Sequence, residues 1–494
     1  MFKRHVIAMA ALFSSPFIAY AGNTLALEDV KSEAKSTIND QQSIAVTIYN
    51  NNLALVKDQR KVKLSLGMQN LAIRDVSAQM RAETALLRSL SNPGSLTPLE
   101  QHFDFDLLTP EKLLEKYVGK TVSIIKTNPA TGEEKTEQAT VLSANNGVVL
   151  KIGNRIETGQ FFTNEKYGRI VFDEIPANLR DRPTLVTQIN NKTTAEQTVE
   201  LSYLTGGLAW KADYVAELGP KEDTIDLSGW VTLTNTSGTS YNNARLQLVA
   251  GDVNRVQENY PRAMAMRKNQ EMMADTAAAT MAEESLLEYH LYSLDRPTTI
   301  AENQTKQVAL LSTTGVPARK ELVLRGADYY YQSQQGDLGT KIKVGVFVEF
   351  DNKEASKLGM PLPKGIMRVY KKDAQGNAQF VGEDNIDHTP KNELVRLKLG
   401  ETFDVTADKK QTDFNVLPRP AKSNSAFESA YEVTLKNAKK EKVMVTVQEP
   451  INGDWTILSE NQPHKKANSA LAVWKIEVPA EGSATLSYRV RVKY

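Results

Sequence analysis

The sequence contains no cysteine. This absence excludes disulfide bonds, thiolate metal sites, cysteine nucleophiles and thiol redox chemistry. We also expect no lipid anchor, because that attachment needs a cysteine at the mature N-terminus. A chain of 494 residues without such cross-links must be stabilised by ordinary hydrophobic cores, and it is long enough to build several of them.

An excess of charge of one sign is lacking as well, since 60 Lys and Arg residues stand against 59 Asp and Glu residues. Nucleic-acid binding needs a concentrated basic face, so we expect no nucleic-acid partner. Beyond the first 21 residues no apolar run is long enough to cross a bilayer, so we expect no transmembrane helix.

Catalytic and cofactor motifs are also missing. The sequence has no G-x-S-x-G, no H-E-x-x-H, no P-loop, no G-x-G-x-x-G after a strand and no EF-hand loop. Four histidines beyond the N-terminal segment share no metal-ligand spacing: His102, His290, His388 and His464. We therefore expect no cofactor and no metal site, predict no catalytic residue, and favour a protein that is not an enzyme.

What is present begins with an export signal. Lys3 and Arg4 precede an apolar stretch at 6–18, and residues 19–21 form an A-x-A cleavage site. The sequence therefore predicts a signal peptide at 1–21 and an exported protein, most simply in the periplasm, with the outer membrane or the extracellular space as alternatives. Residues 22–43 are polar and are expected to form a leader.

The rest of the chain alternates with a period of two, which is typical of strands. The clearest case is the last segment, where Leu486, Tyr488, Val490 and Val492 alternate with polar residues. Polar turn signals such as Asn452-Gly453-Asp454 separate these runs. The pattern predicts an all-β protein built from several immunoglobulin-like or β-sandwich modules, with a small SH3-like or OB-like barrel inserted near the N-terminus.

One short helix is expected after Thr109, which can cap it, with Pro110 at its first position. A segment rich in Met and Ala at 258–290 lacks strand alternation and predicts either a flexible excursion or an amphipathic docking helix. No internal repeat of fixed period is evident. The predicted modules are an N-terminal β-domain at 44–119, the small β-barrel at 120–180, a central β-sandwich region at 181–420 and a C-terminal β-sandwich at 421–494.

Two segments are candidate binding sites. In the first, two glycines precede Trp210, Asp213 and Tyr214. Aromatic rings beside hydrogen-bonding groups bind sugars or peptides, so this segment predicts a binding groove. The alternative is a glycine bend between strands, with Trp210 in the core.

The second candidate is an acidic segment with a histidine, which contains Glu383, Asp384, Asp387 and His388. The carboxylates could hold a hard cation, or Asp387 and His388 could work as an acid–base pair. The alternative is an ordinary loop between two strands, with Pro390 interrupting the pairing.

Three phrases in the chain resemble one family of bacterial exported proteins. They are LSYLTGGLAWKADYVAEL, LSGWVTLTNTSGTSYNNARLQLVAGDVNRV and the segment from PKGIMRVYKKD to GETFDVTA. The shared domain of that family is catalogued as conserved and of unknown function, and some relatives are labelled mucoidy-inhibitor-like. The resemblance runs from about Ile44 to Tyr494 and implies an all-β, multi-sandwich envelope protein, without established catalytic residues.

Three hypotheses about function follow. The leading one is a non-enzymatic, exported β-sandwich protein that acts as a binding or scaffolding component of the bacterial cell envelope, with an envelope protein or a glycan as partner. The second is a glycan-active hydrolase with a loop-borne carboxylate pair at 383–387. The third is an outer-membrane β-barrel protein, because the last alternating strand ends on Tyr494.

Overall fold

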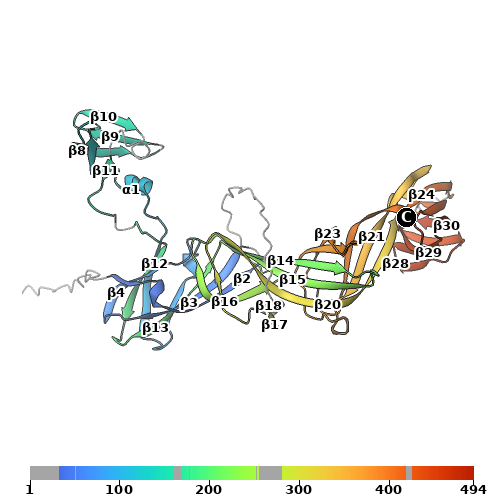
Figure 1. Ribbon diagram of the computed structural model, residues 1–494, viewed down its shortest axis with the longest axis horizontal. Coiled ribbons are helices and arrows are strands. Elements are labelled where there is room, and N and C mark those ends of the chain that lie inside the picture. The colour runs from blue at the N-terminus through green and yellow to red at the C-terminus, as the bar shows by residue number, and fades with distance from the viewer. Residues whose placement is uncertain are drawn as a thin grey trace, which may run out of the picture.

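The computed structural model describes residues 33–494 apart from positions 51, 129, 146, 160–168, 177–178, 252, 255–280 and 419–424. The expected signal peptide and most of the Met/Ala-rich segment lie outside the described residues. The molecule is elongated, with the N-terminal sheets at one end and the C-terminal sandwich at the other (Figure 1). No helix in these described ranges has the length and apolar character needed to cross a membrane.

The all-β prediction is confirmed. The described residues form four sheets and a single α-helix, α1 (Pro110–Lys116). That helix begins as predicted, with the Thr109 side chain accepting a hydrogen bond from the backbone N–H of Lys112 and proline in the first turn. Short 3-10 helices occur at η1 (Ile38–Asp40), η2 (Ala82–Thr84), η4 (Asp328–Tyr331) and η5 (Glu354–Ser356).

The two N-terminal sheets enclose one core with the central region. In order, the four-stranded sheet contains β1 (Glu33–Ser36), β4 (Gly67–Arg74), β12 (Thr184–Asn191) and β6 (Leu96–Asp104). The eight-stranded sheet contains β17 (Ala282–Leu286), β18 (Tyr289–Ser293), β16 (Tyr241–Ala250), β2 (Gln41–Tyr49), β3 (Leu53–Val62), β13 (Gln197–Thr205) and β5 (Leu86–Ser89), with β19 (Thr298–Ile300) beside β16.

The largest sheet has thirteen strands and runs the length of the second half of the chain. Its main path is β23 (Ala378–Ile386), β22 (Gly365–Lys372), β14 (Leu208–Leu218), β15 (Thr224–Asn235), β20 (Gln304–Arg325), β21 (Asp337–Asp351), β24 (Leu394–Val416), β25 (Ala426–Asn437), β30 (Gly482–Lys493) and β27 (Asp454–Glu460). Off this path lie β26 (Val443–Pro450), β29 (Leu471–Val478) and β28 (Lys465–Asn468).

The small module projects from the N-terminal end of the molecule (Figure 1). Its strand order is β10 (Arg155–Gly159), β9 (Val148–Ile152), β8 (Glu134–Ser143), β7 (Thr121–Thr127) and β11 (Arg169–Val171). It therefore lies where a small β-module was predicted, but β10 and β11 are the two ends of the described sheet, which does not close into a barrel. Its separate core includes Leu114 and Tyr117 from the helix.

Several strands pair across the predicted module limits. Residues 33–43, expected in the polar leader, form β1, η1 and the start of β2, because β1 adds in parallel to β4. Strands β12 and β13, expected in the central region, pair with N-terminal strands instead. Strands β20 and β24 are 22 and 23 residues long and enter both the central and the C-terminal cores, so the two cores share strands.

A repeated device joins the sandwich strands, although the sequence shows no fixed period. Asn235, Asn352 and Asn437 each stand at or just after the end of a long strand, and each is buried. Each amide donates to a pair of successive carbonyls in a distant segment: Ile300 and Ala301, Thr389 and Pro390, and Val478 and Pro479, respectively. We call these three residues the asparagine latches, because each hydrogen-bonds the end of its strand to two successive carbonyls of a distant segment.

Candidate functional site

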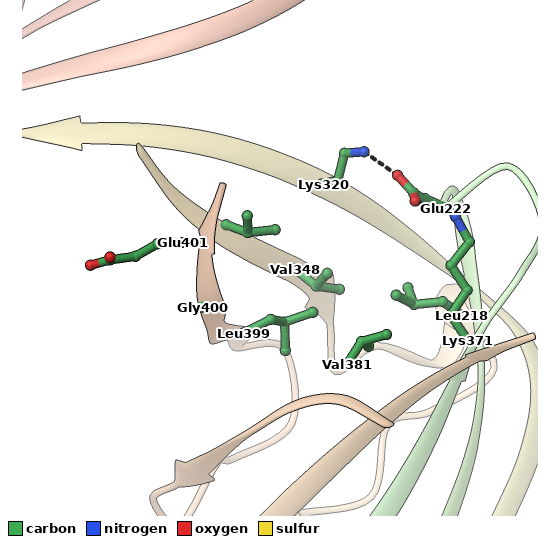
Figure 2. A pocket seen from close by; sticks show the side chains of 10 residues that line it. Leu218, Glu222, Lys320, Val348, Lys371, Val381, Leu399, Gly400 and Glu401 are labelled. Atoms are coloured by element: carbon green, nitrogen blue, oxygen red, sulfur yellow. Dashed lines mark hydrogen bonds and ion pairs between the residues drawn. The ribbon is translucent and has the colours of Figure 1, made fainter. Parts of the chain in front are cut away.

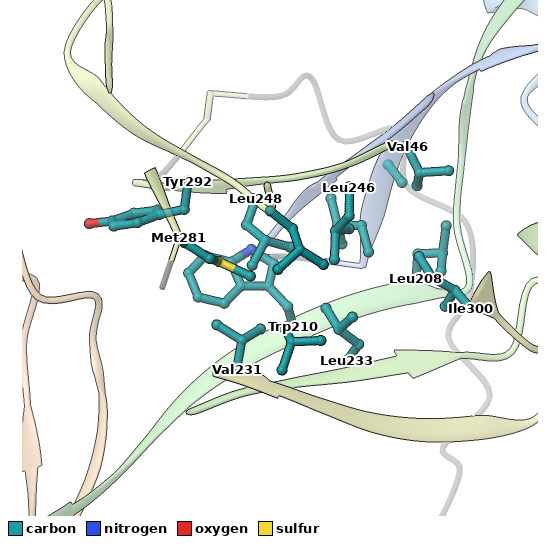
Figure 3. Close-up of a cluster of buried hydrophobic side chains, with 14 of the residues drawn as sticks. Val46, Leu208, Trp210, Val231, Leu233, Leu246, Leu248, Met281, Tyr292 and Ile300 are labelled. Carbon is teal, nitrogen blue, oxygen red and sulfur yellow. The ribbon is translucent and has the colours of Figure 1, made fainter. Parts of the chain in front are cut away.

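Strand β14 divides the first predicted cluster between its two faces. Trp210 is only 5% exposed and lies in the core among Val46, Leu246 and Leu248 (Figure 3). Tyr214 is also buried, where its hydroxyl donates to the carbonyl oxygen of Pro363 at 2.8 Å and desolvation raises its pKa well above the usual value. Because alternate residues of a strand face opposite sides, the residues at even positions belong to the core. A ligand could reach Trp210 only if this core opened.

Asp213 points to the outer side of the same strand. One carboxylate oxygen accepts a hydrogen bond from the Thr232 hydroxyl at 2.8 Å, and the Gln307 amide donates in turn to that hydroxyl at 3.2 Å. The other carboxylate oxygen pairs with Arg368 at 3.2 Å and with Lys211 at 3.4 Å. Asp213 is therefore held at the centre of a network that crosses four neighbouring strands, β22, β14, β15 and β20.

Arg368 connects the two predicted clusters. It lies on β22, which pairs in parallel with β14 on one side and antiparallel with β23 on the other. Its Nη1 contacts Asp213, while its Nε lies 3.2 Å from a carboxylate oxygen of Glu383. The fold thus brings Asp213 and Glu383 onto one surface through a single guanidinium, although they lie far apart in the sequence.

The other predicted residues of the acidic segment make separate contacts. Asp384 follows Glu383 on the strand and faces the other side, where its carboxylate accepts from the backbone N–H of Lys398 at 2.7 Å. The Asp387 carbonyl accepts from the Thr389 hydroxyl, and Nδ1 of His388 accepts from the backbone N–H of Lys364 at 3.3 Å. Within the described ranges, no group of three or more His, Asp or Glu side chains is placed to hold a metal ion.

Aromatic side chains that the sequence did not single out flank the charged row. Trp230 stands directly opposite Asp213 in the β14–β15 ladder and so shares its face. Tyr370 and Phe380 meet edge to face, with ring centroids 5.7 Å apart, on β22 and β23. We call this surface the polar–aromatic face; it consists of Asp213, Trp230, Thr232, Gln307, Arg368, Tyr370, Phe380 and Glu383.

The face combines paired charges with exposed aromatic surface. Its two carboxylates, those of Asp213 and Glu383, both contact the guanidinium of Arg368. Phe380 is 55% exposed, and its ring offers apolar contact next to hydrogen-bonding groups. Strand alternation at 367–370, where Arg368 and Tyr370 alternate with the apolar Met367 and Val369, was a sequence signal for two of these residues.

Comparison with known families gives one match. The family model described as "Domain of unknown function (DUF4139)" matches residues 199–494. The match begins in β13 and includes every residue of the polar–aromatic face as well as the whole C-terminal sandwich. A search of curated proteins found no match.

Proposed function

Because the chain belongs to the family defined by this domain of unknown function, we propose that it is an exported, non-enzymatic β-sandwich protein. It acts as a binding or scaffolding component of the bacterial cell envelope, and a glycan is its ligand. The observation that carries the proposal is the polar–aromatic face, which lies within the family domain.

The chemistry of the face favours a carbohydrate. Sugars combine a hydrogen-bonding rim with apolar ring faces, and they therefore bind where aromatic rings stand beside fixed polar groups. Trp230, Tyr370 and Phe380 supply the rings, while Asp213 and Arg368 supply acceptors and donors that their mutual contacts hold in place. A face that spreads over adjacent strands matches an extended chain better than a small enclosed ligand.

A glycan-active hydrolase is less well supported. Such an enzyme needs two carboxyl groups facing one cleft, about 5 to 10 Å apart. Glu383 and Asp384 face opposite sides of β23, so these two carboxylates do not face one cleft, and Glu383 shares Arg368 with Asp213.

The test is binding of the full-length purified protein to alginate, dextran and soluble peptidoglycan fragments by titration calorimetry. We expect one of these to bind and Phe380→Ala to weaken that binding about tenfold, which corresponds to roughly 1.4 kcal/mol. Phe403→Ala is the matched control, since Phe403 is 91% exposed but lies outside the face. Equal losses in the two variants, or no binding by the wild type, would contradict the proposal.

The envelope location has its own test. Fractionation of cells that express the full chain, followed by a carbonate wash of the membranes, is expected to release the protein into the soluble periplasmic pool. Retention in the washed outer membrane would contradict a periplasmic location and would direct attention to transport or surface display.

A further inference from the structure

A cavity of about 180 Å³ is lined mainly by strands of the thirteen-stranded sheet (Figure 2). Lys371 lines it and follows Tyr370 on β22, so the cavity lies on the side of the sheet opposite to the polar–aromatic face. Its wall is apolar and is formed by Leu218, Val346, Val348, Val381 and Leu399. These side chains come from β14, β21, β23 and β24, which are distant in sequence. The cavity is therefore a product of the fold and not of a single loop.

The curvature of the sheet encloses this cavity. Strands β22, β14, β15, β20, β21 and β24 follow one another, and β23 at the free edge returns to the side of β24. At the seam, Gly382 approaches the Leu399 carbonyl so closely that a Cβ there would collide with it. Among the described strands no ladder pairs β23 with β24, and the Asp384 carboxylate instead accepts from the Lys398 N–H. An apolar interior with one open end is a common position for ligand sites.

The mouth of the cavity carries two cations and one shared anion. Glu222, in the turn between β14 and β15, pairs one oxygen with Lys320 and the other with Lys371. Its backbone has a φ of 59°, a left-handed conformation that is costly for glutamate. Glu401 also lines the cavity, but its side chain points away from the lysines (Figure 2). The two lysines therefore exceed the one carboxylate that faces them.

We propose that this cavity binds a single-chain carboxylate, whose alkyl chain fills the apolar part and whose head group replaces the Glu222 carboxylate between Lys320 and Lys371. The volume is close to the ~150 Å³ of an engineered cavity that accepts benzene, so it has room for a short alkyl chain and not for a two-chain lipid. The charge of the head group matches the surplus of positive charge at the mouth. This proposal does not rest on glycan binding at the opposite face.

The adjacent residues Lys371 and Lys372 provide a matched pair for the test. Lys371 faces the cavity, whereas Lys372 faces outward and pairs with Glu217 at 2.5 Å. Titration calorimetry of the full-length protein with sodium octanoate is expected to give one saturable site. Lys371→Met should weaken octanoate binding at least tenfold, while Lys372→Met should leave it unchanged.

Three further measurements separate this site from non-specific binding. 1-Octanol, which lacks the charge, should bind at least tenfold more weakly than octanoate, and inorganic phosphate alone should not bind. Glu222→Gln should tighten octanoate binding several-fold, because it weakens the internal competitor. Absence of octanoate binding to the wild type, an equal effect of Lys371→Met and Lys372→Met, or weaker binding in a folded Glu222→Gln variant would overturn the proposal; circular dichroism establishes that each variant is folded.

Discussion

The ion pair Lys409–Glu449 in the C-terminal core and the row Asp213–Arg368–Glu383 on the polar–aromatic face belong to the same sheet but differ in exposure. The side chains of Lys409 and Glu449 are 2% and 0% exposed, with Nζ 2.7 and 2.6 Å from the two carboxylate oxygens. The side chains of Arg368 and Glu383 are 32% and 50% exposed, whereas that of Asp213 is 10% exposed.

The surroundings of the two groups differ accordingly. The Tyr331 hydroxyl donates to Glu449 at 2.8 Å, and Nζ of Lys409 lies 4.4 Å from the centroid of the Tyr330 ring. Desolvation lowers the pKa of Lys409, although Glu449 opposes this effect. Gly326 leaves the space that the Glu449 carboxylate occupies, since a Cβ there would collide with it.

The two groups differ in how easily their charges can change partners. A buried pair cannot exchange partners, because each ion left alone would be uncompensated in a low-dielectric core. Exposed charges such as those of Arg368 and Glu383 can exchange partners at small cost, since water replaces any contact that is lost. The C-terminal pair is therefore fixed in its core, whereas Arg368 and Glu383 on the polar–aromatic face remain in contact with solvent.

The largest effect is expected from breaking the buried pair. Lys409→Met leaves the Glu449 carboxylate without its cation and should destabilise the C-terminal sandwich by about 3–5 kcal/mol. Hydrogen exchange of peptides from β24 and β26 measures this change in the full chain. The double variant Lys409→Met/Glu449→Leu should recover most of the loss, because the unpaired charge is gone; no recovery would mean that packing and not charge dominates.

A smaller loss of stability is expected when an asparagine latch is removed, and latches occur in both the central and the C-terminal regions. Asn437→Ala removes the donor for Val478 and Pro479, and Asn235→Ala removes the donor for Ile300 and Ala301. Each should cost about 2–4 kcal/mol, because buried carbonyls lose their partners. Hydrogen exchange should show the loss around β25 for the first variant and around β15 for the second. A loss spread evenly over both regions would show that the two cores unfold as one unit.

Arg368→Met should have a small effect on stability and a large effect on glycan binding. Arg368 is 32% exposed and Asp213 keeps Thr232 and Lys211 as partners, so the expected loss of stability is about 1 kcal/mol or less. Glycan binding should fall at least tenfold, because Asp213 and Glu383 lose the group that positions both. Arg491→Met, which breaks the exposed pair with Glu428 outside the face, is the matched control. Unchanged glycan binding in Arg368→Met would remove the charged row from the proposed site.

Local pattern predicted much of the fold. The alternation at 486–492 became β30 with those residues buried, and Thr109 and Pro110 begin the predicted helix. Local pattern could not predict that the two cores share strands. The sequences of β20 and β24 show strand alternation but do not show which core each part of the strand enters. The short strand β1 was missed for a related reason: its stability comes from pairing with β4, which is distant in sequence.

The candidate site was predictable only in part. The sequence marked Asp213 and Glu383, but nothing local shows that β22 pairs in parallel with β14 and so places Arg368 between them. The assignment of residues to the two faces of β14, in contrast, could be predicted from the sequence. Trp210 and Asp213 differ by an odd number of positions, so a strand through both must place them on opposite faces.

The smallest expected effect is on the pH dependence of stability, through Glu222 at the cavity mouth. This carboxylate is intermediate in exposure between the buried Glu449 and the more exposed Glu383. Desolvation opposes the ionised form of Glu222, but the hydrogen bonds from Lys320 and Lys371 outweigh it and lower its pKa below the usual 4.5. A carboxyl with a lowered folded-state pKa contributes stability above its unfolded pKa and loses that contribution as pH falls through the folded value. The urea midpoint of the wild type should therefore exceed that of Glu222→Gln by a constant amount between about pH 7 and 5, and this difference should shrink below about pH 4.5. A difference that stays constant to pH 3 would show that the turn is held by packing and not by the charge of Glu222.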